Sequence, residues 1–181
     1  MSVDTFVILS DERLPSVAEW QRALDQAGVD IRLDDVDDLR QHSGYLPARF
    51  NGADSGFEWY YGIVDEVFGE RPDGAGGRGH AIDLVTHDDE QEAMCALYAA
   101  GVLARLTDGL FYDEDAGDFV PGDRAMEIAA EWARSEQERK QRLAAADAAL
   151  TDRRCPECGA PCPSYRKTCK ACGYSVGQLD K

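Results

Sequence analysis

Short apolar runs and alternating aromatic positions in the first two thirds of the sequence predict a series of β-strands. The predicted strands lie at 5–9, 31–33, 45–50, 57–61, 81–87, 110–112 and 118–120. Each run is rich in β-branched, aliphatic or aromatic side chains, and turn-forming residues bound it. Residues 51–56 have the composition of a hairpin loop, so we expect the runs on either side of them to pair.

The aromatic residues of the strand at 57–61 alternate between its two faces. Phe57, Trp59 and Tyr61 fall on one face, and Glu58 and Tyr60 fall on the other. A row of rings can form a platform for stacked bases, but such platforms sit among basic residues, which this stretch lacks. The pattern therefore predicts that these aromatic residues pack in the core.

Three stretches show the spacing of amphipathic helices. In the first, Ser16 and Glu19 match a capping box, and a glycine follows the last apolar position. The stretch 88–107 begins with acidic caps and is apolar around most of its circumference, so we expect it to lie in the core. A third pattern starts at Pro121 and runs to about residue 150, with an apolar face in its first half and mostly charged residues after it.

This order of elements predicts an α+β fold in which helices cover one side of an antiparallel sheet. At 181 residues the chain can bury one hydrophobic core and has room for a small appendage. We expect an acidic α+β domain at 1–133, a helical connector at 134–152, a cysteine-rich module at 153–176 and a tail at 177–181.

Five cysteines lie near the end of the sequence, and four of them have the spacing of metal ligands. Cys155 and Cys158 form one C-x-x-C pair, Cys169 and Cys172 form another, and a glycine follows each pair. Four thiolates on two tight turns can surround one tetrahedral zinc ion. Cys162 lies between the pairs without this spacing, and the sequence leaves open whether it replaces one of the four.

The stretch 153–176 resembles the short zinc-ribbon family, whose members carry two knuckles of the form C-P-x-C-G. The first knuckle of this chain has that form, and the second lacks the proline. The resemblance implies one structural Zn²⁺ and a surface for contacts with protein or nucleic acid. It does not imply catalysis, because four cysteine ligands leave the zinc no open position.

The start of the sequence bears on the state of these thiols. Residues 1–4 lack the basic start and the long apolar run of a secretory signal, so we expect a cytoplasmic protein with reduced thiols rather than disulfides. No apolar run in the sequence approaches the length of a membrane span, and we expect no membrane partner.

Charge divides the sequence into two unequal parts. The formal net charge of −16 arises from 33 acidic and 13 basic residues up to Asp152, against two acidic and six basic residues beyond it. The acidic part should repel nucleic acids and membrane surfaces and attract a basic protein partner. High solubility, or a halophilic or GC-rich host, would give the same composition.

The acidic part also resembles the small acidic bacterial proteins that act as immunity proteins against toxins of their own cell, above all at 44–59 and 107–120. The resemblance implies that its carboxylates cover the cationic surface of a nuclease-like toxin and block it. The candidate partner-binding residues are Asp34, Asp35, Asp37, Asp38, Asp113, Asp115 and Asp118. The sequence does not predict the oligomeric state.

The motif content favours binding over catalysis, and we expect no enzymatic activity. His42, His80 and His87 are scattered, and the sequence lacks the common motifs of serine hydrolases, zinc proteases and phosphate-binding loops. A carboxylate-based, metal-dependent nuclease is the enzymatic alternative. A second binding alternative is a zinc-ribbon adaptor that contacts nucleic acid through its basic residues, namely Arg153, Arg154, Arg166, Lys167 and Lys170.

Overall fold

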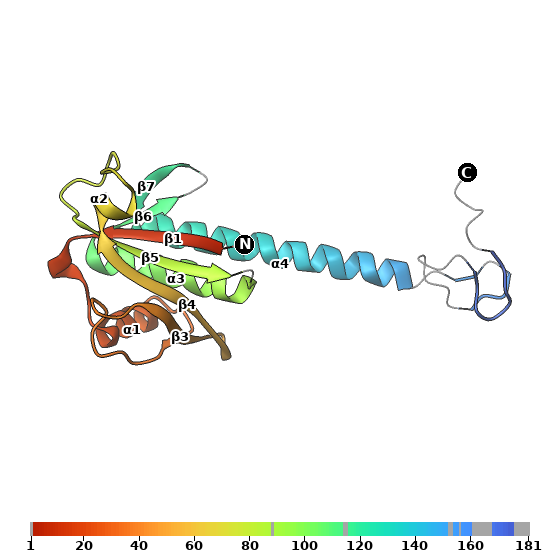
Figure 1. Cartoon of the computed structure of the whole chain (residues 1–181). Helices are drawn as coiled ribbons and strands as arrows, with labels where there is room; N and C mark the ends of the chain where they lie inside the picture. Colours follow the sequence, from red (N-terminus) through yellow and green to blue (C-terminus); the bar gives the residue numbers. More distant parts are fainter. Residues whose placement is uncertain are drawn as a thin grey trace. The chain divides into compact units, whose positions relative to one another are not determined.

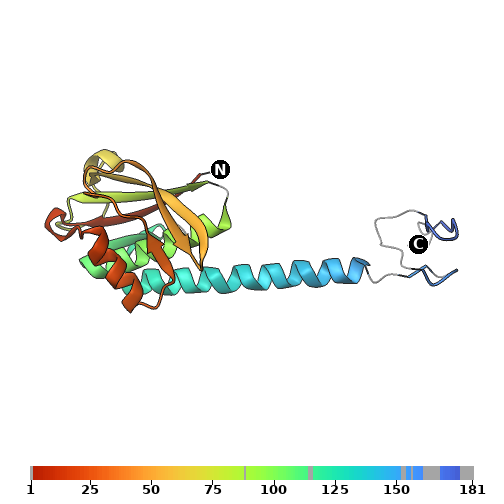
Figure 2. The same cartoon turned by 90° about the horizontal axis from the view of Figure 1, so that it is seen from below.

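An antiparallel sheet of seven strands, in the order β2-β3-β4-β5-β1-β6-β7, is the framework of the fold (Figure 1). The computed structural model describes residues 2–87, 89–113, 116–151, 154–155, 157–160 and 168–175. The strands are β1 (Ser2–Leu9), β2 (Ile31–Leu33), β3 (Gly44–Phe50), β4 (Ala53–Ile63), β5 (His80–His87), β6 (Leu110–Asp113) and β7 (Asp118–Pro121). Helices α1 (Val17–Gln26) and α3 (Glu90–Thr107) lie on one face of the sheet (Figure 2). The predicted α+β class is confirmed.

Two compact units divide the chain, Met1–Glu131 and Trp132–Lys181. The first unit holds the sheet, α1, α3, the short helix α2 (Val64–Val67), a 3₁₀ turn at Asp11–Arg13 and the start of α4 (Gly122–Thr151). The second unit holds the rest of α4 and the four paired cysteines. The long helical pattern predicted after Pro121 is therefore one continuous helix.

Helix α1 begins at the predicted capping box. The Ser16 hydroxyl accepts a hydrogen bond from the Glu19 N–H (3.3 Å), and the Glu19 carboxylate accepts one from the Ser16 N–H (2.9 Å). These two bonds satisfy donors that the first turn of a helix otherwise leaves unpaired. The helix then turns Val17, Trp20 and Leu24 toward the core.

Aromatic side chains form the centre of the core between α1 and the sheet. The ring of Trp20 lies 5.4 Å from that of Trp59 and 6.1 Å from that of Phe57, and all three side chains are fully buried. Both indole N–H groups find backbone acceptors, the Ala99 carbonyl for Trp20 (3.1 Å) and the Leu39 carbonyl for Trp59 (2.9 Å). Core packing rather than base stacking is thus confirmed for Phe57 and Trp59.

The hairpin between β3 and β4 is tighter than predicted. Its turn consists of Asn51 and Gly52 alone, at φ values of 52° and 76°, and Phe50 pairs with Ala53. The predicted loop at 51–56 was wrong, because Asn-Gly is itself the preferred two-residue turn and the residues after it continue the strand. The register therefore differs from the one expected from the sequence.

Part of the second face of the sheet is also covered, by an element that the sequence pattern did not predict. Val64 of α2 and Ala75 of the following loop are buried against Ile8 and Ala81, which point away from α3. Phe68 extends this second cluster through tilted and edge-on contacts with Phe6 of β1, Tyr112 of β6 and Phe119 of β7. Apolar contacts, together with hydrogen bonds from the Arg71 and Arg78 side chains to backbone carbonyls, hold the glycine-rich loop on the sheet.

The first turns of α4 approach α3 closely because small residues line the contact. A Cβ added to Gly122 would lie 2.2 Å from the Arg105 amide nitrogen, and one added to Gly101 would lie 3.0 Å from the Met126 sulfur. On α4 itself, Ala125 and Ala129 are buried. The start of α4 is therefore an integral part of the core of the first unit.

Candidate metal centre

Four cysteine sulfurs of the second unit, those of Cys155, Cys158, Cys169 and Cys172, all lie within 4.8 Å of one another. The Cys155 and Cys172 sulfurs are 3.6 Å apart, and the Cys158 and Cys169 sulfurs are 3.7 Å apart. A tetrahedral zinc ion with Zn–S bonds of about 2.3 Å would set its sulfur ligands about 3.8 Å apart. The four residues predicted from the sequence thus form a group that can bind one metal ion.

Each cysteine pair sits on a backbone turn of the same form. In the first turn the Gly159 N–H donates to the Cys155 carbonyl (2.8 Å), and the Cys155 N–H donates to the Ala160 carbonyl (2.9 Å). The second turn, which starts at Cys169, repeats both bonds at the same offsets, with lengths of 2.9 and 2.8 Å. The glycine that follows each pair has a positive φ, 69° in the first turn and 77° in the second. A side chain would strain these two positions, which explains the glycines.

Backbone dipoles favour the metal-binding form of at least one thiol. Cys155 and Cys169 are buried, whereas Cys158 and Cys172 are exposed. Hydrogen bonds from the backbone N–H groups of Cys172 and Ala171 lower the pKa of Cys169 to about 6, whereas contacts with the other cysteine sulfurs raise the pKa of Cys158 and Cys172. Because the thiolate is the form that ligates a metal ion, the turn itself prepares this ligand.

The predicted basic residues of this region are only partly placed. The Arg154 guanidinium donates to the Gly159 carbonyl (3.1 Å), so it supports the first turn. Lys170 is exposed beside the second turn. Cys162, Arg153, Arg166 and Lys167 lie outside the described residues.

The predicted aspartates lie in two groups at different parts of the sheet. Asp34, Asp35, Asp37 and Asp38 belong to the loop between β2 and β3, whereas Asp113 and Asp118 are paired residues of β6 and β7. Three strands, β4, β5 and β1, separate β3 from β6, a distance of roughly 20 Å at the usual strand spacing. Asp115 lies outside the described residues. The sheet does not bring the two groups together into one surface.

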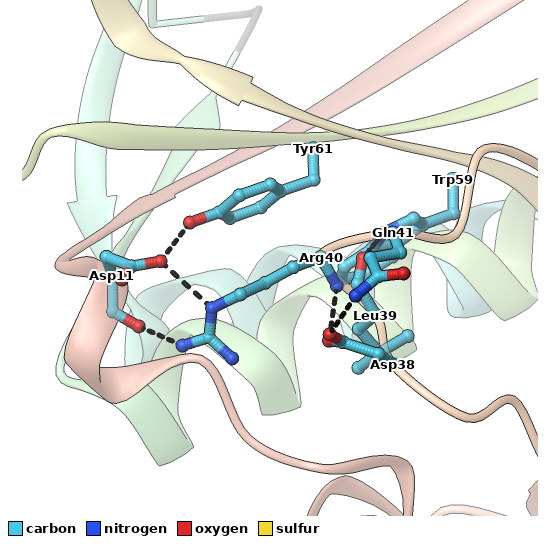
Figure 3. A network of polar contacts seen from close by, with 7 residues as sticks. All are labelled: Asp11, Asp38, Leu39, Arg40, Gln41, Trp59 and Tyr61. Atoms are coloured by element: carbon cyan, nitrogen blue, oxygen red, sulfur yellow. Dashed lines mark hydrogen bonds and ion pairs between the residues drawn. The ribbon is translucent and has the colours of Figure 1, made fainter.

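One of these aspartates is used by its own loop (Figure 3). The Asp38 carboxylate accepts hydrogen bonds from the Arg40 N–H (2.9 Å) and the Gln41 side chain (3.2 Å). The Arg40 guanidinium in turn donates to the Asp11 carboxylate (3.1 Å) and carbonyl (2.7 Å), and Tyr61 donates to the same carboxylate. Hydrogen bonds from Tyr61 and Arg40 lower the pKa of Asp11. The network ties the acidic loop to β4 and to the 3₁₀ turn that follows β1.

His80, His87 and Cys95 have side chains that often act in catalysis, but they lie in different environments. The His80 ring stacks on Tyr61 with ring centroids 5.1 Å apart, and His87 Nε2 contacts Glu58 at 3.2 Å. Cys95 is fully buried in α3, and burial raises the pKa of its thiol to about 12. This thiol stays protonated at neutral pH and is therefore a poor nucleophile.

The sequence did not reveal a polar group on the face of the sheet that points away from α3. There the Tyr60 hydroxyl donates to the Glu58 carboxylate (2.6 Å), and Asp83 of β5 lies directly beside Tyr60 in the strand register. The alternation of Glu58 and Tyr60 on one face was visible in the sequence. Their neighbour Asp83 was not, because it depends on how β4 pairs with a strand some twenty residues further along.

Comparisons of the chain with protein-family models, with curated proteins and with solved structures gave no match. Within the described ranges, no helix combines the length and the apolar character needed to cross a bilayer. The function is therefore inferred from the residues and contacts of the chain itself.

Proposed function

We propose that the chain is a non-enzymatic protein-binding module whose acidic first unit binds a basic protein partner. In its most specific form the proposal is an immunity protein, which neutralises a basic, nuclease-like bacterial toxin by covering the toxin's cationic surface. One observation carries the proposal, the charge of the first unit. Its 29 acidic and nine basic residues, all of the latter arginines, give a net charge of −20.

Most of the positive charge of this unit is already used internally. Among the described residues, six of its nine arginines pair with carboxylates of the same unit, namely Arg32, Arg40, Arg49, Arg71, Arg105 and Arg124. The carboxylates outside these pairs outnumber the three other arginines many times over. Such a field attracts a cationic surface, speeds its association and repels nucleic acid.

The second unit, in this proposal, is a zinc ribbon with one structural Zn²⁺. Sites made of four thiolates select zinc or iron–sulfur centres over harder cations, and two C-x-x-C turns give zinc its closed tetrahedral site. The metal would supply the folding free energy of this small segment and would have no open position for a substrate.

A second candidate function is an adaptor that contacts nucleic acid through the second unit. The observation in its favour is charge, because the second unit carries ten basic and six acidic residues and a net charge of +4. An excess of four positive charges supports modest, strongly salt-dependent binding to phosphates. Lys170, beside the second cysteine turn, is exposed and available for such contacts.

Affinity capture of the tagged full chain from its host at low salt, followed by native mass spectrometry, tests the proposal. We expect one zinc ion and one basic protein in fixed stoichiometry, released when the salt concentration is raised. A chain that carries nucleic acid and no protein would support the adaptor instead. A monomeric chain without a companion at low salt would contradict both.

The toxin-neutralising form needs a further measurement on the captured protein. Its nuclease activity is assayed with and without the full chain at equimolar concentration. We expect the chain to abolish the activity. An active complex would leave a protein-binding module without an immunity role.

A further inference from the structure

The face of the sheet opposite α1 and α3 is covered at one end by α2 and the loop that follows it. Beyond this cover, strands β1, β4 and β5 present polar and aromatic side chains. We call this area the open face. It consists of Asp4, Glu58, Tyr60, Asp83, Val85 and His87.

Strand register brings these residues together from distant parts of the sequence. One cross-strand row contains, in order, Glu58, Val85 and Asp4. The adjacent row places Tyr60 beside Asp83. Side chains at neighbouring positions of this kind start about 5 Å apart. Three carboxylates from three different strands therefore share one patch.

These carboxylates have little positive charge near them. Within the described residues, no arginine or lysine pairs with Asp4, Glu58 or Asp83, and Glu58 contacts Tyr60 and His87 instead. The Asp83 Oδ1 atom is buried without a hydrogen-bond partner in the described part of the chain. Burial and the nearby carboxylates of Asp4 and Glu58 raise the pKa of Asp83 to about 7. A cationic side chain placed here would reduce the repulsion among the three carboxylates and could donate the hydrogen bond that Asp83 Oδ1 lacks.

Tyr60 lies beside the carboxylates and remains accessible, whereas the hydroxyl of the nearby Tyr45 reaches Glu92 in the first turn of α3. Tyr60 is 40% exposed and Tyr45 is 50% exposed. The ring of Tyr45 lies over Gly56, where a Cβ would come within 2.5 Å of its hydroxyl oxygen, so the glycine makes room for it. A phenol ring beside a carboxylate suits a guanidinium group, which stacks on the ring and donates to the carboxylate.

We propose that the open face is the surface that binds the basic protein, with an arginine side chain of that protein stacked on Tyr60 and hydrogen-bonded to Asp83 and Asp4. This inference rests on the proposed function and adds to it the contact surface and the recognised side chain. The aspartate groups at 34–38 and 113–118 are weaker candidates, because they lie apart and Asp38 already bonds within its own loop.

The charge of the open face argues against other occupants. A second copy that docked through the same face would place its own three carboxylates against these three, since a two-fold interface is self-complementary. Nucleic acids and anionic lipid surfaces would meet the same repulsion. A protein segment that carries arginine is the class of ligand that fits both the carboxylates and the exposed Tyr60 ring.

The surface is tested by titrating the ¹⁵N-labelled full chain with a nona-arginine peptide at physiological salt and following the amide signals by NMR. We expect the largest shifts in β4, β5 and β1, around Glu58, Asp83 and Asp4. Shifts concentrated in the loop at 34–38 or in the β6–β7 hairpin would overturn the assignment.

Matched variants separate a specific surface from general negative charge. At pH 8, where Asp83 is mostly ionised, the triple variant Asp4→Asn, Glu58→Gln and Asp83→Asn and the control triple variant Asp34→Asn, Asp35→Asn and Asp37→Asn remove nearly the same charge. We expect the first to weaken binding of the peptide by about tenfold or more, and the second by about twofold. Equal losses in both would show that net charge alone binds the peptide and would overturn the proposal.

The same variants distinguish failure of this surface from failure of the proposed function. If the control triple variant loses the captured basic protein while the open-face triple variant keeps it, the partner binds elsewhere and the proposed function stands. If the wild-type chain binds neither the peptide nor any basic protein at low salt, both proposals fail. The single variant Asp83→Asn guards against misfolding, because it removes an unfavourable charge and should raise the Tm while it weakens peptide binding.

Discussion

Different interactions stabilise the folded structure of each of the two units. In the first unit, a continuous apolar core fills the space between the sheet and its helices and buries three large aromatic rings completely. Among the described residues of the second unit, Cys155 and Cys169 alone are buried, with Ala160 and Tyr174 packed beside them. Hydrophobic burial organises the first unit, and four sulfurs organise the second.

This difference decides what each unit needs in order to fold. Ordering a segment costs conformational entropy at every residue, and a large apolar core offsets that cost. A segment that buries two side chains has no such core and requires a staple such as a metal ion. We therefore expect the first unit to fold without a metal ion and the cysteine turns to require one.

Removal of the metal should have the largest effect and should affect one unit only. Cys169→Ser is expected to unfold the cysteine turns, because metal binding contributes about 10–16 kcal/mol to folding in small zinc modules. In ¹⁵N NMR spectra the signals of the two cysteine turns should collapse toward random-coil positions while those of the first unit stay dispersed. Cys95→Ala, which alters a thiol of the first unit, should leave the metal content at one ion per chain. Loss of the first unit's dispersed signals in Cys169→Ser would contradict the separation.

Truncation of a core aromatic residue should destabilise the first unit and leave metal binding by the second unit unchanged. Trp20→Ala is expected to lower the free energy of unfolding of the first unit by about 3–5 kcal/mol, since it removes a fully buried ring that contacts Trp59 and Phe57. Urea denaturation followed by circular dichroism measures this free energy of unfolding, and the metal content of the variant is the second readout. Leu143→Ala, at a side chain of α4 that is 58% exposed, should change the same value by less than about 0.5 kcal/mol. Loss of metal from Trp20→Ala at low urea would show that metal binding by the second unit depends on the stability of the first, which would contradict their separation.

The contact between α3 and α4 offers a smaller perturbation. Gly122→Ala would force a methyl group to within 2.2 Å of the Arg105 backbone, so we expect a loss of about 1–3 kcal/mol in the stability of the first unit. Gly77→Ala is the matched control, because a Cβ at that loop position meets nothing within 4 Å. Equal melting temperatures for the two variants would show that α4 is not part of the core.

Asp83 should make the first unit less stable as the pH rises. Its pKa is raised from 3.8 to about 7 in the folded state, so between about pH 4 and pH 7 the folded state binds more protons than the unfolded state, and stability falls with rising pH. Asp83→Asn lacks this fall. We expect the variant to match the wild type near pH 4 and to exceed it by about 1–2 kcal/mol at pH 8, allowing for solvent screening of a half-exposed group. A constant difference across this range would contradict the assignment.

The capping box of α1 should give the smallest effect. Ser16→Ala removes the side-chain acceptor of the Glu19 N–H and is expected to cost about 1 kcal/mol. Thermal unfolding of the first unit measures the change. Ser135→Ala, at an exposed position inside α4, is the control and should leave that transition unchanged. A Tm for Ser16→Ala equal to that of the control would mean that the cap contributes nothing.

The elements that the sequence predicted well are those that short-range chemistry determines. The capping box at Ser16 and the alternation of Phe57, Trp59 and Tyr61 involve residues within a few positions of one another. The two cysteine turns belong to the same category, since each depends on a C-x-x-C pair and the glycine after it. Such patterns can be recognised without knowledge of the rest of the fold.

The parts that the sequence predicted poorly depend on pairing between distant segments. The loop proposed at 51–56 assumed a long turn, whereas the observed register requires only Asn51 and Gly52. The cover on the second face arises because Ala75 packs against residues of β1 and β5, and no periodic pattern marks that loop. The aspartates at 34–38 were predicted to bind a partner because they are adjacent in sequence. Adjacency does not determine whether the fold leaves their carboxylates available for a partner.

The sequence by itself determined the α+β class, the main helices and strands, the four paired cysteines and the division of charge between the two ends of the chain. Each follows from composition or from contacts over a few residues. Only the tertiary structure decided that four sulfurs converge within 4.8 Å and that Asp4, Glu58 and Asp83 share one face. The physical reason is that strand pairing and turn geometry, rather than position along the chain, set the distance between charged groups, and that distance determines what each group can bind.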